Sequence, residues 1–182
     1  GFPPGVFNVV TGDARVGQAL TVHPEVRKIS FTGGSETGKI IARNASQNLT
    51  PVTLELGGKS PNIIFEDANL ENAVVGAVAG IFAATGQTCI AGSRLLVQRK
   101  VYDEVVAKIV ERAKNIRLGN PLERATEMGP VANEAQLKKV LSFIEKAKEE
   151  GARVMAGGKR AEGDELAKGL FVEPTVLADV TN

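Results

Sequence analysis

Residues 26–56 have the sequence VRKISFTGGSETGKIIARNASQNLTPVTLEL, and this pattern is the strongest guide to the fold class. Val26–Phe31 and Val52–Leu56 are short runs rich in apolar and β-branched residues, which predicts strands. Between them, Ser35 is expected to be the N-cap of a helix from Glu36 to about Gln47. A strand, a helix and a second strand at this spacing predict a right-handed βαβ unit with parallel strands.

The same alternation continues on both sides of this stretch. Further strands are predicted at 6–10, 62–65, 94–98 and 152–156, an extended segment at 170–177, and helices at 14–21, 101–115 and 134–150. Another helix, running through Ala73–Ile81, is apolar nearly all round and is predicted to be buried. Asn133 and Gln136 predict a capping box, and Gly151 the C′ position of the same helix. The sequence therefore predicts an α/β fold with a parallel sheet.

The composition excludes several classes of protein. The chain has 182 residues, of which 43% are hydrophobic and 24% charged, with a net charge of +1, one Cys and one His. One cysteine cannot form a disulfide scaffold, and one Cys and one His cannot supply a structural zinc site, so we expect no metal. The charge is balanced, so the chain has no broad basic surface to bind nucleic acid, and no apolar run is long enough to span a bilayer. We therefore expect neither nucleic acid nor a membrane as a partner.

The two ends lead us to expect a piece of a longer chain. The sequence begins with Gly1 rather than Met, and it stops at Asn182 without a helix cap or closing element. The Gly57–Gly58 pair is the predicted domain boundary, which gives parts at residues 1–57 and 58–182. We expect a cytoplasmic protein, although a targeting signal on the longer chain stays open.

The glycine-rich turn after the first strand of the βαβ unit could bind phosphate. Residues 33–39 fit the G-x-x-x-x-G-K pattern of NTPase loops, but the next position, where a hydroxyl should ligate magnesium, is Ile40. Ile63–Asp67 resembles the acidic strand of such enzymes only in part, so a P-loop NTPase is a remote alternative. Backbone N–H groups at a helix N-terminus still suit a phosphate or pyrophosphate. A tight turn that needs glycine for a positive φ is the alternative.

Two other residues could carry chemistry. Glu55 ends a strand beside glycines, where open α/β sheets bind ligands, so it could be a general base whose pKa apolar neighbours raise, or an exposed acid at an edge. Cys89 lies in the loop Gly86–Arg94, where backbone N–H groups could stabilise a thiolate or an oxyanion, or it could be an inert thiol. His23 is remote in sequence, so a Cys–His dyad is not expected.

These motifs resemble the two signatures of the aldehyde dehydrogenase superfamily. Glu55–Pro61 has the sequence ELGGKSP, and Gly86–Arg94 has the sequence GQTCIAGSR, with 34 residues from Glu55 to Cys89. Four further stretches resemble the family in the same order, namely residues 5–10, 31–33, 119–121 and 129–130. The resemblance covers the whole chain.

The resemblance implies a chemical role for each motif. Cys89 would be the nucleophile that forms a thiohemiacetal with an aldehyde, and Glu55 the base that activates water to hydrolyse the thioester. The cofactor would be NAD or NADP. The matching cofactor-binding positions are Gly33, Gly34, Ser35, Leu56, Gly57, Gln136 and Lys139. The family more often has serine where this sequence has Gly34, which removes one hydroxyl contact to phosphate.

The resemblance also implies how much of a complete enzyme the chain contains. The chain would hold the later part of a Rossmann-type cofactor domain and most of the catalytic domain, in a three-layer, parallel-sheet architecture. Glu55 favours the hydrolytic branch, which forms carboxylic acids from aldehydes. The full-length parent would be a homo-oligomer, and this portion alone would have little or no activity. The alternative from another class is a non-catalytic nucleotide-binding or structural fragment.

Overall fold

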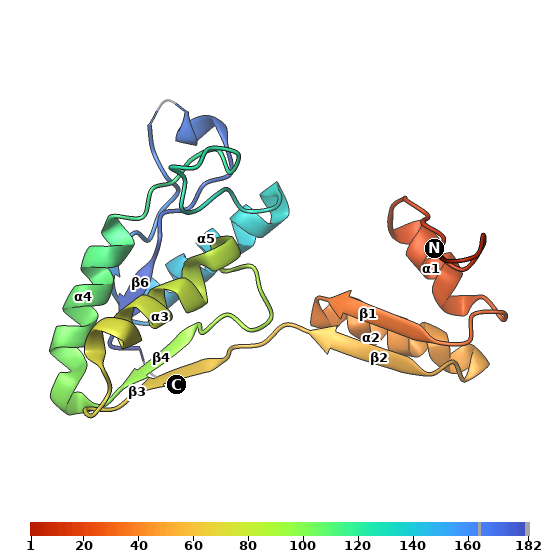
Figure 1. Cartoon of the computed structure of the whole chain (residues 1–182), viewed down its shortest axis with the longest axis horizontal. Helices are drawn as coiled ribbons and strands as arrows, with labels where there is room; N and C mark the ends of the chain where they lie inside the picture. The colour runs from red at the N-terminus through yellow and green to blue at the C-terminus, as the bar shows by residue number, and fades with distance from the viewer. Residues whose placement is uncertain (164, 181–182) are drawn as a thin grey trace. The chain divides into compact units, whose positions relative to one another are not determined.

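The computed structural model describes residues 1–163 and 165–180. The chain divides into two units, Gly1–Gly57 and a second that begins at Gly58. The division falls at the glycine pair where the sequence predicts a boundary. Figure 1 shows the helices and strands of both units.

The first unit is a parallel βαβ arrangement. Strands β1 (Ile29–Gly33) and β2 (Val52–Leu56) pair in parallel from Ile29 opposite Val52 to Gly33 opposite Leu56. Helix α2 (Ser35–Ala45) connects them and packs on the pair, and helix α1 (Ala14–Val22) packs on α2 (Figure 1). A Cβ atom at Gly38 would lie 2.9 Å from a methyl carbon of Leu56, so the glycine lets α2 approach β2 closely.

Several details of the first unit differ from the prediction. Strand β1 spans Ile29–Gly33, whereas the sequence predicted a strand at Val26–Phe31. Residues 6–10 form a bend and irregular chain rather than a strand, and Phe7 is 79% exposed. A β-branched run becomes a strand only when a neighbour pairs with it, and none lies beside this one among the described residues. Gly34, not Ser35, is the N-cap of α2, and Ser35 is its first helical residue.

The core of the second unit lies between one sheet and two helices. Strands β3 (Pro61–Ile64) and β4 (Arg94–Val97) are parallel, and helices α3 (Leu70–Phe82) and α4 (Tyr102–Lys114) pack together beside them (Figure 1). The buried side chains that meet there are those of Ile64, Val74, Ala77, Val105 and Ile109. The prediction that α3 is wholly buried is wrong, because Val75 on its far side is 46% exposed.

A second cluster forms around helix α5 (Glu134–Glu149). Val131, Leu137, Ile144 and Val172 are its buried members. The Asn133 side chain caps the helix by accepting a bond from the Gln136 N–H at 2.9 Å, which is one half of the predicted capping box; the return bond from the Asn133 N–H to the Gln136 side chain does not form. Gly151 follows the helix with φ of +90°, as the sequence predicts. Strands β5 (Arg153–Ala156) and β6 (Val176–Ala178) come next and, unlike the other pairs, are antiparallel.

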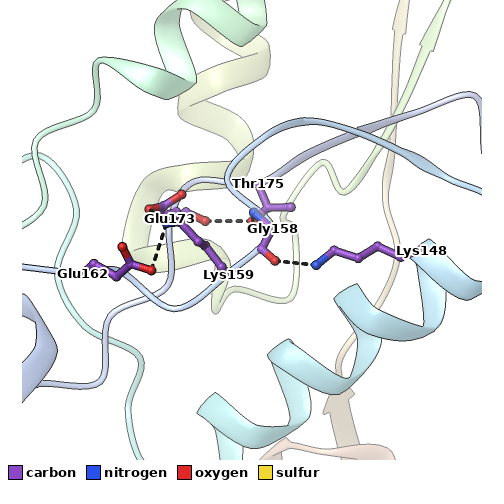
Figure 2. A network of polar contacts seen from close by, with 6 residues as sticks. All are labelled: Lys148, Gly158, Lys159, Glu162, Glu173 and Thr175. Atoms are coloured by element: carbon purple, nitrogen blue, oxygen red, sulfur yellow. Dashed lines mark hydrogen bonds and ion pairs between the residues drawn. The ribbon is translucent and has the colours of Figure 1, made fainter.

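A polar network fixes the chain between β5 and β6 (Figure 2). The Lys148 ammonium donates to the Gly158 carbonyl at 2.9 Å, and the Gly158 N–H donates to the Thr175 hydroxyl at 3.0 Å. Lys159 pairs with Glu162 at 3.0 Å and with Glu173 at 3.7 Å. The hydrogen bond to Glu162, more than the charge of Glu173, raises the pKa of Lys159.

Candidate functional site

The predicted phosphate-binding residues gather at the carboxyl ends of β1 and β2. Gly33 lies opposite Leu56 in the sheet, and the chain continues from these residues into Gly34 and Gly57. Gly34 supplies no side-chain cap to α2, and the first bond inside the helix runs from the Gly38 N–H to the Gly34 carbonyl at 3.0 Å. The N–H groups of residues 35–37 therefore have no partner within the helix, which suits an anion.

The glycines of this turn are not there to allow a left-handed backbone. Gly34 has φ of −74° and ψ of 147°, which any residue can adopt, and Gly33 also lacks a positive φ. The tight-turn alternative is therefore wrong. Because Gly34 has no side chain, the backbone N–H groups at the N-terminus of α2 have no side chain of that residue beside them.

The NTPase alternative gains no support. A P-loop lysine must reach the phosphates, but the Lys39 ammonium bonds to Glu36 at 2.8 Å on the exposed surface of α2. This bond also lowers the pKa of Glu36. The lysine thereby offsets the one acidic charge in the first turn of α2.

Glu55 is exposed on β2. Along this strand Val52, Leu54 and Leu56 are half-buried, whereas Thr53 and Glu55 are exposed. Because successive side chains of a strand point to opposite faces, the carboxylate lies on the face away from α2. Of the two settings that the sequence left open for Glu55, a base among apolar neighbours and an exposed acid, its own unit provides the exposed one, at the end of a strand.

An unusual left-handed turn precedes Cys89. After α3 ends, Ala84, Thr85 and Gly86 have φ values of +49°, +58° and +69°. The conformation is expected only of the glycine, and for a β-branched residue such as Thr85 it costs on the order of 1–3 kcal/mol. The sequence gives no signal for it at Ala84 or Thr85. The turn redirects the chain from α3 into the loop that carries the cysteine.

Two side chains that the sequence analysis missed tie this loop to the segment before α5. The Thr85 hydroxyl donates to the Gly129 carbonyl at 3.1 Å. The side-chain oxygen of Gln87 accepts a bond from the Ala132 N–H at 2.9 Å. The only sequence signal was that Gln87 belongs to the cysteine motif and residue 129 to another family-like stretch. Neither fact indicated a contact between them.

The chain just after the glycine pair lies beside the cysteine loop. The Arg94 guanidinium donates to the Lys59 carbonyl at 2.8 Å, and a Cβ atom at Gly58 would lie 3.5 Å from the Cys89 carbonyl oxygen. The second unit therefore brings the end of one signature against the other. The Cys89 side chain itself is a free, exposed thiol.

The remaining candidates lie on the first turns of α5. Gln136 is half-buried and Lys139 is exposed. They are three residues apart, so they share a face of the helix. The cap uses the backbone N–H of Gln136, which leaves its side-chain amide out of the capping bond. Glu55 and the glycine turn belong to the first unit, whereas Cys89, Gln136 and Lys139 belong to the second.

The part of the chain that the structure describes contains no cluster of side chains suited to bind a metal ion. No group of three or more His, Cys, Asp or Glu side chains is placed there to hold an ion. Over the same residues, no helix combines the length and apolar character needed to cross a membrane.

Comparison with known proteins decides the family. A sequence model described as the aldehyde dehydrogenase family matches residues 1–182. The chain belongs to the aldehyde dehydrogenase family. Among curated relatives, the betaine aldehyde dehydrogenases of Brucella anthropi and Sinorhizobium fredii are 48% and 47% identical to it over its whole length. The chain spans 37% of the length of each of these relatives.

Solved aldehyde dehydrogenases have the same fold. The betaine aldehyde dehydrogenase of Staphylococcus aureus, crystallised with NAD+, superposes with a TM-score of 0.95 and 47% identity over all of this chain and 36% of that one. HpcC of Thermus thermophilus gives 0.93 and 46% over 97% of this chain and 35% of its own. The predicted α/β, aldehyde-dehydrogenase-like fold is thereby confirmed.

Proposed function

We propose that this aldehyde dehydrogenase chain is the central part of an NAD(P)-dependent enzyme that oxidises a small aldehyde to a carboxylic acid. Residues 1–57 would form the later part of its cofactor domain, and the chain from Gly58 most of its catalytic domain. The observation that carries the proposal is the exposed thiol of Cys89 in a loop held beside Gly58 and Lys59 of the Glu55–Pro61 signature.

The cofactor assignment is supported by the N-terminus of α2. Its uncapped N–H groups, with Gly33, Gly34, Ser35, Leu56 and Gly57 around them, suit the pyrophosphate of NAD(P)+. Gln136 and Lys139 share a face of α5 and would contact the ribose next to the nicotinamide. The related staphylococcal structure was solved with NAD+.

The cysteine would begin the reaction. The Cys89 thiolate attacks the aldehyde carbon and forms a C–S bond, and the negative charge moves to the former carbonyl oxygen. The backbone N–H of Cys89 would hold that oxyanion. NAD(P)+, when bound, supplies the acceptor for the hydride that leaves this carbon and so converts the thiohemiacetal into a thioester.

Glu55 would complete the cycle. Its carboxylate takes a proton from a water molecule as the water oxygen attacks the thioester carbon. The C–S bond then breaks, which releases the carboxylic acid and regenerates the Cys89 thiolate. An exposed carboxylate at the end of β2 is accessible to water and suits this task.

We also propose what the longer protein would be. It would act as a cytoplasmic homo-oligomer on a small aldehyde, with no nucleic acid or membrane as partner. The curated relatives are named for betaine aldehyde, which makes that compound the first substrate to try. The 182-residue chain by itself would have little or no turnover, since it spans 37% of such an enzyme.

A hybrid enzyme tests the proposal. The matching segment of the staphylococcal betaine aldehyde dehydrogenase, which is 47% identical, is replaced by this chain. The hybrid should oxidise betaine aldehyde with NAD+, and Cys89→Ser should lower kcat by roughly a thousandfold or more because a hydroxyl is a far weaker nucleophile than a thiolate. A matched control, Gln98→Met, alters a side chain bonded to Glu66 rather than to the cysteine loop and should leave turnover unchanged.

Calorimetry on the 182-residue chain gives an independent measurement. Binding of NAD+ or NADP+ with release or uptake of heat would support the cofactor assignment. Turnover that survives Cys89→Ser would disprove the role of the cysteine. A chain without affinity for either nucleotide, together with an inactive hybrid, would favour the non-catalytic alternative.

A further inference from the structure

Gln87 occupies a bridging position in the second unit. It lies two residues before Cys89, and its side-chain oxygen accepts a bond from the Ala132 N–H at 2.9 Å. Ala132 directly precedes Asn133, the cap of α5. A continuous set of bonds thus runs from the cysteine loop through Gln87 to the first turn of that helix.

The nitrogen of the Gln87 side-chain amide is bonded as well as its oxygen. The amide nitrogen donates to the Ala84 carbonyl at 3.4 Å, and the backbone N–H of Gln87 donates to the same carbonyl at 3.1 Å. Gln87 therefore joins the left-handed turn on one side and the segment before α5 on the other. A side-chain amide whose oxygen and nitrogen are both bonded has little freedom to leave its position.

A second contact runs parallel to the first. The Thr85 hydroxyl donates to the Gly129 carbonyl, at 3.1 Å. One bond would let the loop pivot, whereas two bonds, three residues apart on the partner segment, also fix its orientation. The Val131 N–H in turn donates to the Leu170 carbonyl at 2.9 Å, which secures the partner segment to the body of the unit.

We propose that Gln87 is a positioning residue that makes the cysteine loop and the N-terminus of α5 move as one body. Under the proposed function, on which this part of the inference rests, α5 contacts the ribose beside the nicotinamide. Cofactor binding at Gln136 and Lys139 would then adjust the position of Cys89 through Ala132 and Gln87. The bond therefore couples occupancy of the cofactor site to the placement of the nucleophile.

The single cysteine makes a direct test possible on the 182-residue chain. The rate of Cys89 alkylation by iodoacetamide is measured from pH 6 to 10, and the rate at the high-pH plateau, where the thiol is fully ionised, is compared between variants. Hydrogen exchange of the Ala132 amide reports the bond itself. In Gln87→Met we expect Ala132 to exchange at least about fivefold faster, because its acceptor is gone. The plateau alkylation rate should change by at least about threefold, since the loop is released.

Two variants separate positioning from general damage. Gln87→Glu keeps the oxygen that accepts from the Ala132 N–H and loses only the 3.4 Å donor to the Ala84 carbonyl, so it should restore Ala132 exchange to within about twofold of the wild-type value. Gln98→Met removes an equivalent bond, from the Glu66 N–H at 2.8 Å, elsewhere in the unit, and should change neither the exchange nor the alkylation rate. If Gln87→Met fails to fold, as judged by circular dichroism, the nearly isosteric Thr85→Val is read by the same alkylation assay.

The outcomes distinguish this inference from the proposed function. Unchanged alkylation and exchange in Gln87→Met, or an equal effect of Gln98→Met, would overturn the positioning role. Saturating NAD+ should change Cys89 alkylation in the wild type and have no effect in Gln87→Met. Absence of any NAD+ effect in the wild type would count against the proposed cofactor site, while the cofactor-free comparison still decides whether Gln87 positions the loop.

Discussion

At the scale of single residues, the left-handed turn before Cys89 is the costliest local feature. Ala84 is exposed and has φ of +49°. Gly86 has φ of +69°, and a Cβ atom added to it would lie 3.2 Å from the Ile81 carbonyl oxygen, which is a tight contact. The left-handed conformation is thus unfavourable for Ala84 and favourable for Gly86. Exchanging alanine and glycine at these two positions should therefore have opposite effects on stability.

We predict that Ala84→Gly raises the free energy of unfolding by about 0.5–1 kcal/mol, because relief of the left-handed alanine outweighs the added entropy of the unfolded chain. Gly86→Ala should lower it by about 1–3 kcal/mol, because it adds both strain and a tight contact. Urea denaturation of the two variants measures both values. Destabilisation by Ala84→Gly of the same size as by Gly86→Ala would mean that the turn is not left-handed.

The second residue-scale prediction concerns Glu55. In the hybrid enzyme, Glu55→Gln should leave the first turnover fast and slow the steady state by about 10²–10⁴-fold, because only thioester hydrolysis needs the base. Rapid mixing should show a burst of NADH equal to the number of active sites. Loss of the burst along with the steady rate would assign Glu55 to an earlier step.

At the scale of elements, the loop between β5 and β6 is stabilised by charge. The pKa of Lys159 is raised above its ordinary value of 10.5, chiefly by its bond to Glu162 and further by Glu173. Since the folded pKa exceeds the unfolded one, the stabilising contribution is complete below about pH 10.5 and is lost as the pH rises through the folded pKa.

We therefore predict that Lys159→Met lowers the urea midpoint at pH 8 and that the difference from the wild type becomes smaller as the pH rises above 10.5. Equilibrium urea curves at several pH values measure this difference. Lys168→Met, which removes a similar exposed pair with Glu165 at 2.8 Å, serves as a control for the loss of an ordinary surface lysine. A difference of the same size at pH 8 and pH 11 would show that Lys159 acts through packing instead.

The elements also show what the sequence could and could not predict. Strand β2 and helices α1, α4 and α5 form within a residue or two of their expected bounds, because each carries its own periodicity or its own end signals. The strand predicted at 6–10 failed because pairing depends on a neighbour, which no local pattern encodes. The burial of α3 was overestimated for a related reason, since an apolar surface shows what could be covered and not what covers it.

At the scale of the whole molecule, the two units differ in how much they bury. Ile41 and Ala45 are the buried apolar side chains of the first unit. The second has two clusters, with Val105 at 0% exposure in the centre of one. A small unit with so little buried apolar surface opens easily, because stability rises with the area removed from water.

We predict that amides of β1 and β2 exchange with solvent at least about tenfold faster than those of the centre of α4, measured by hydrogen–deuterium exchange on the 182-residue chain. A saturating nucleotide should slow exchange in the first unit if the glycine turn binds pyrophosphate. Equal protection of the two units without nucleotide would show that they unfold as one.

The candidate site was predictable from sequence only as separate pieces. The two signatures name Cys89 and Glu55, and the structure brings Gly58 and Lys59 of one signature beside the cysteine loop of the other. Thr85 and Gln87 could not be assigned in advance, because their partners Gly129 and Ala132 lie more than 40 residues away in sequence. A contact of that kind depends on how the elements pack, and a single sequence does not report it.

The two-stranded sheets affect how the 182-residue chain behaves when it is concentrated. Each parallel pair, among the described residues, ends in open edges whose N–H and C=O groups can pair with another copy, and Ile63 and Leu96 lie exposed on β3 and β4. A net charge of +1 and an isoelectric point near 8.0 give the copies little mutual repulsion. Storage near pH 8 therefore favours strand-to-strand aggregation, and a more acidic buffer, in which every copy carries a larger positive charge, counters it.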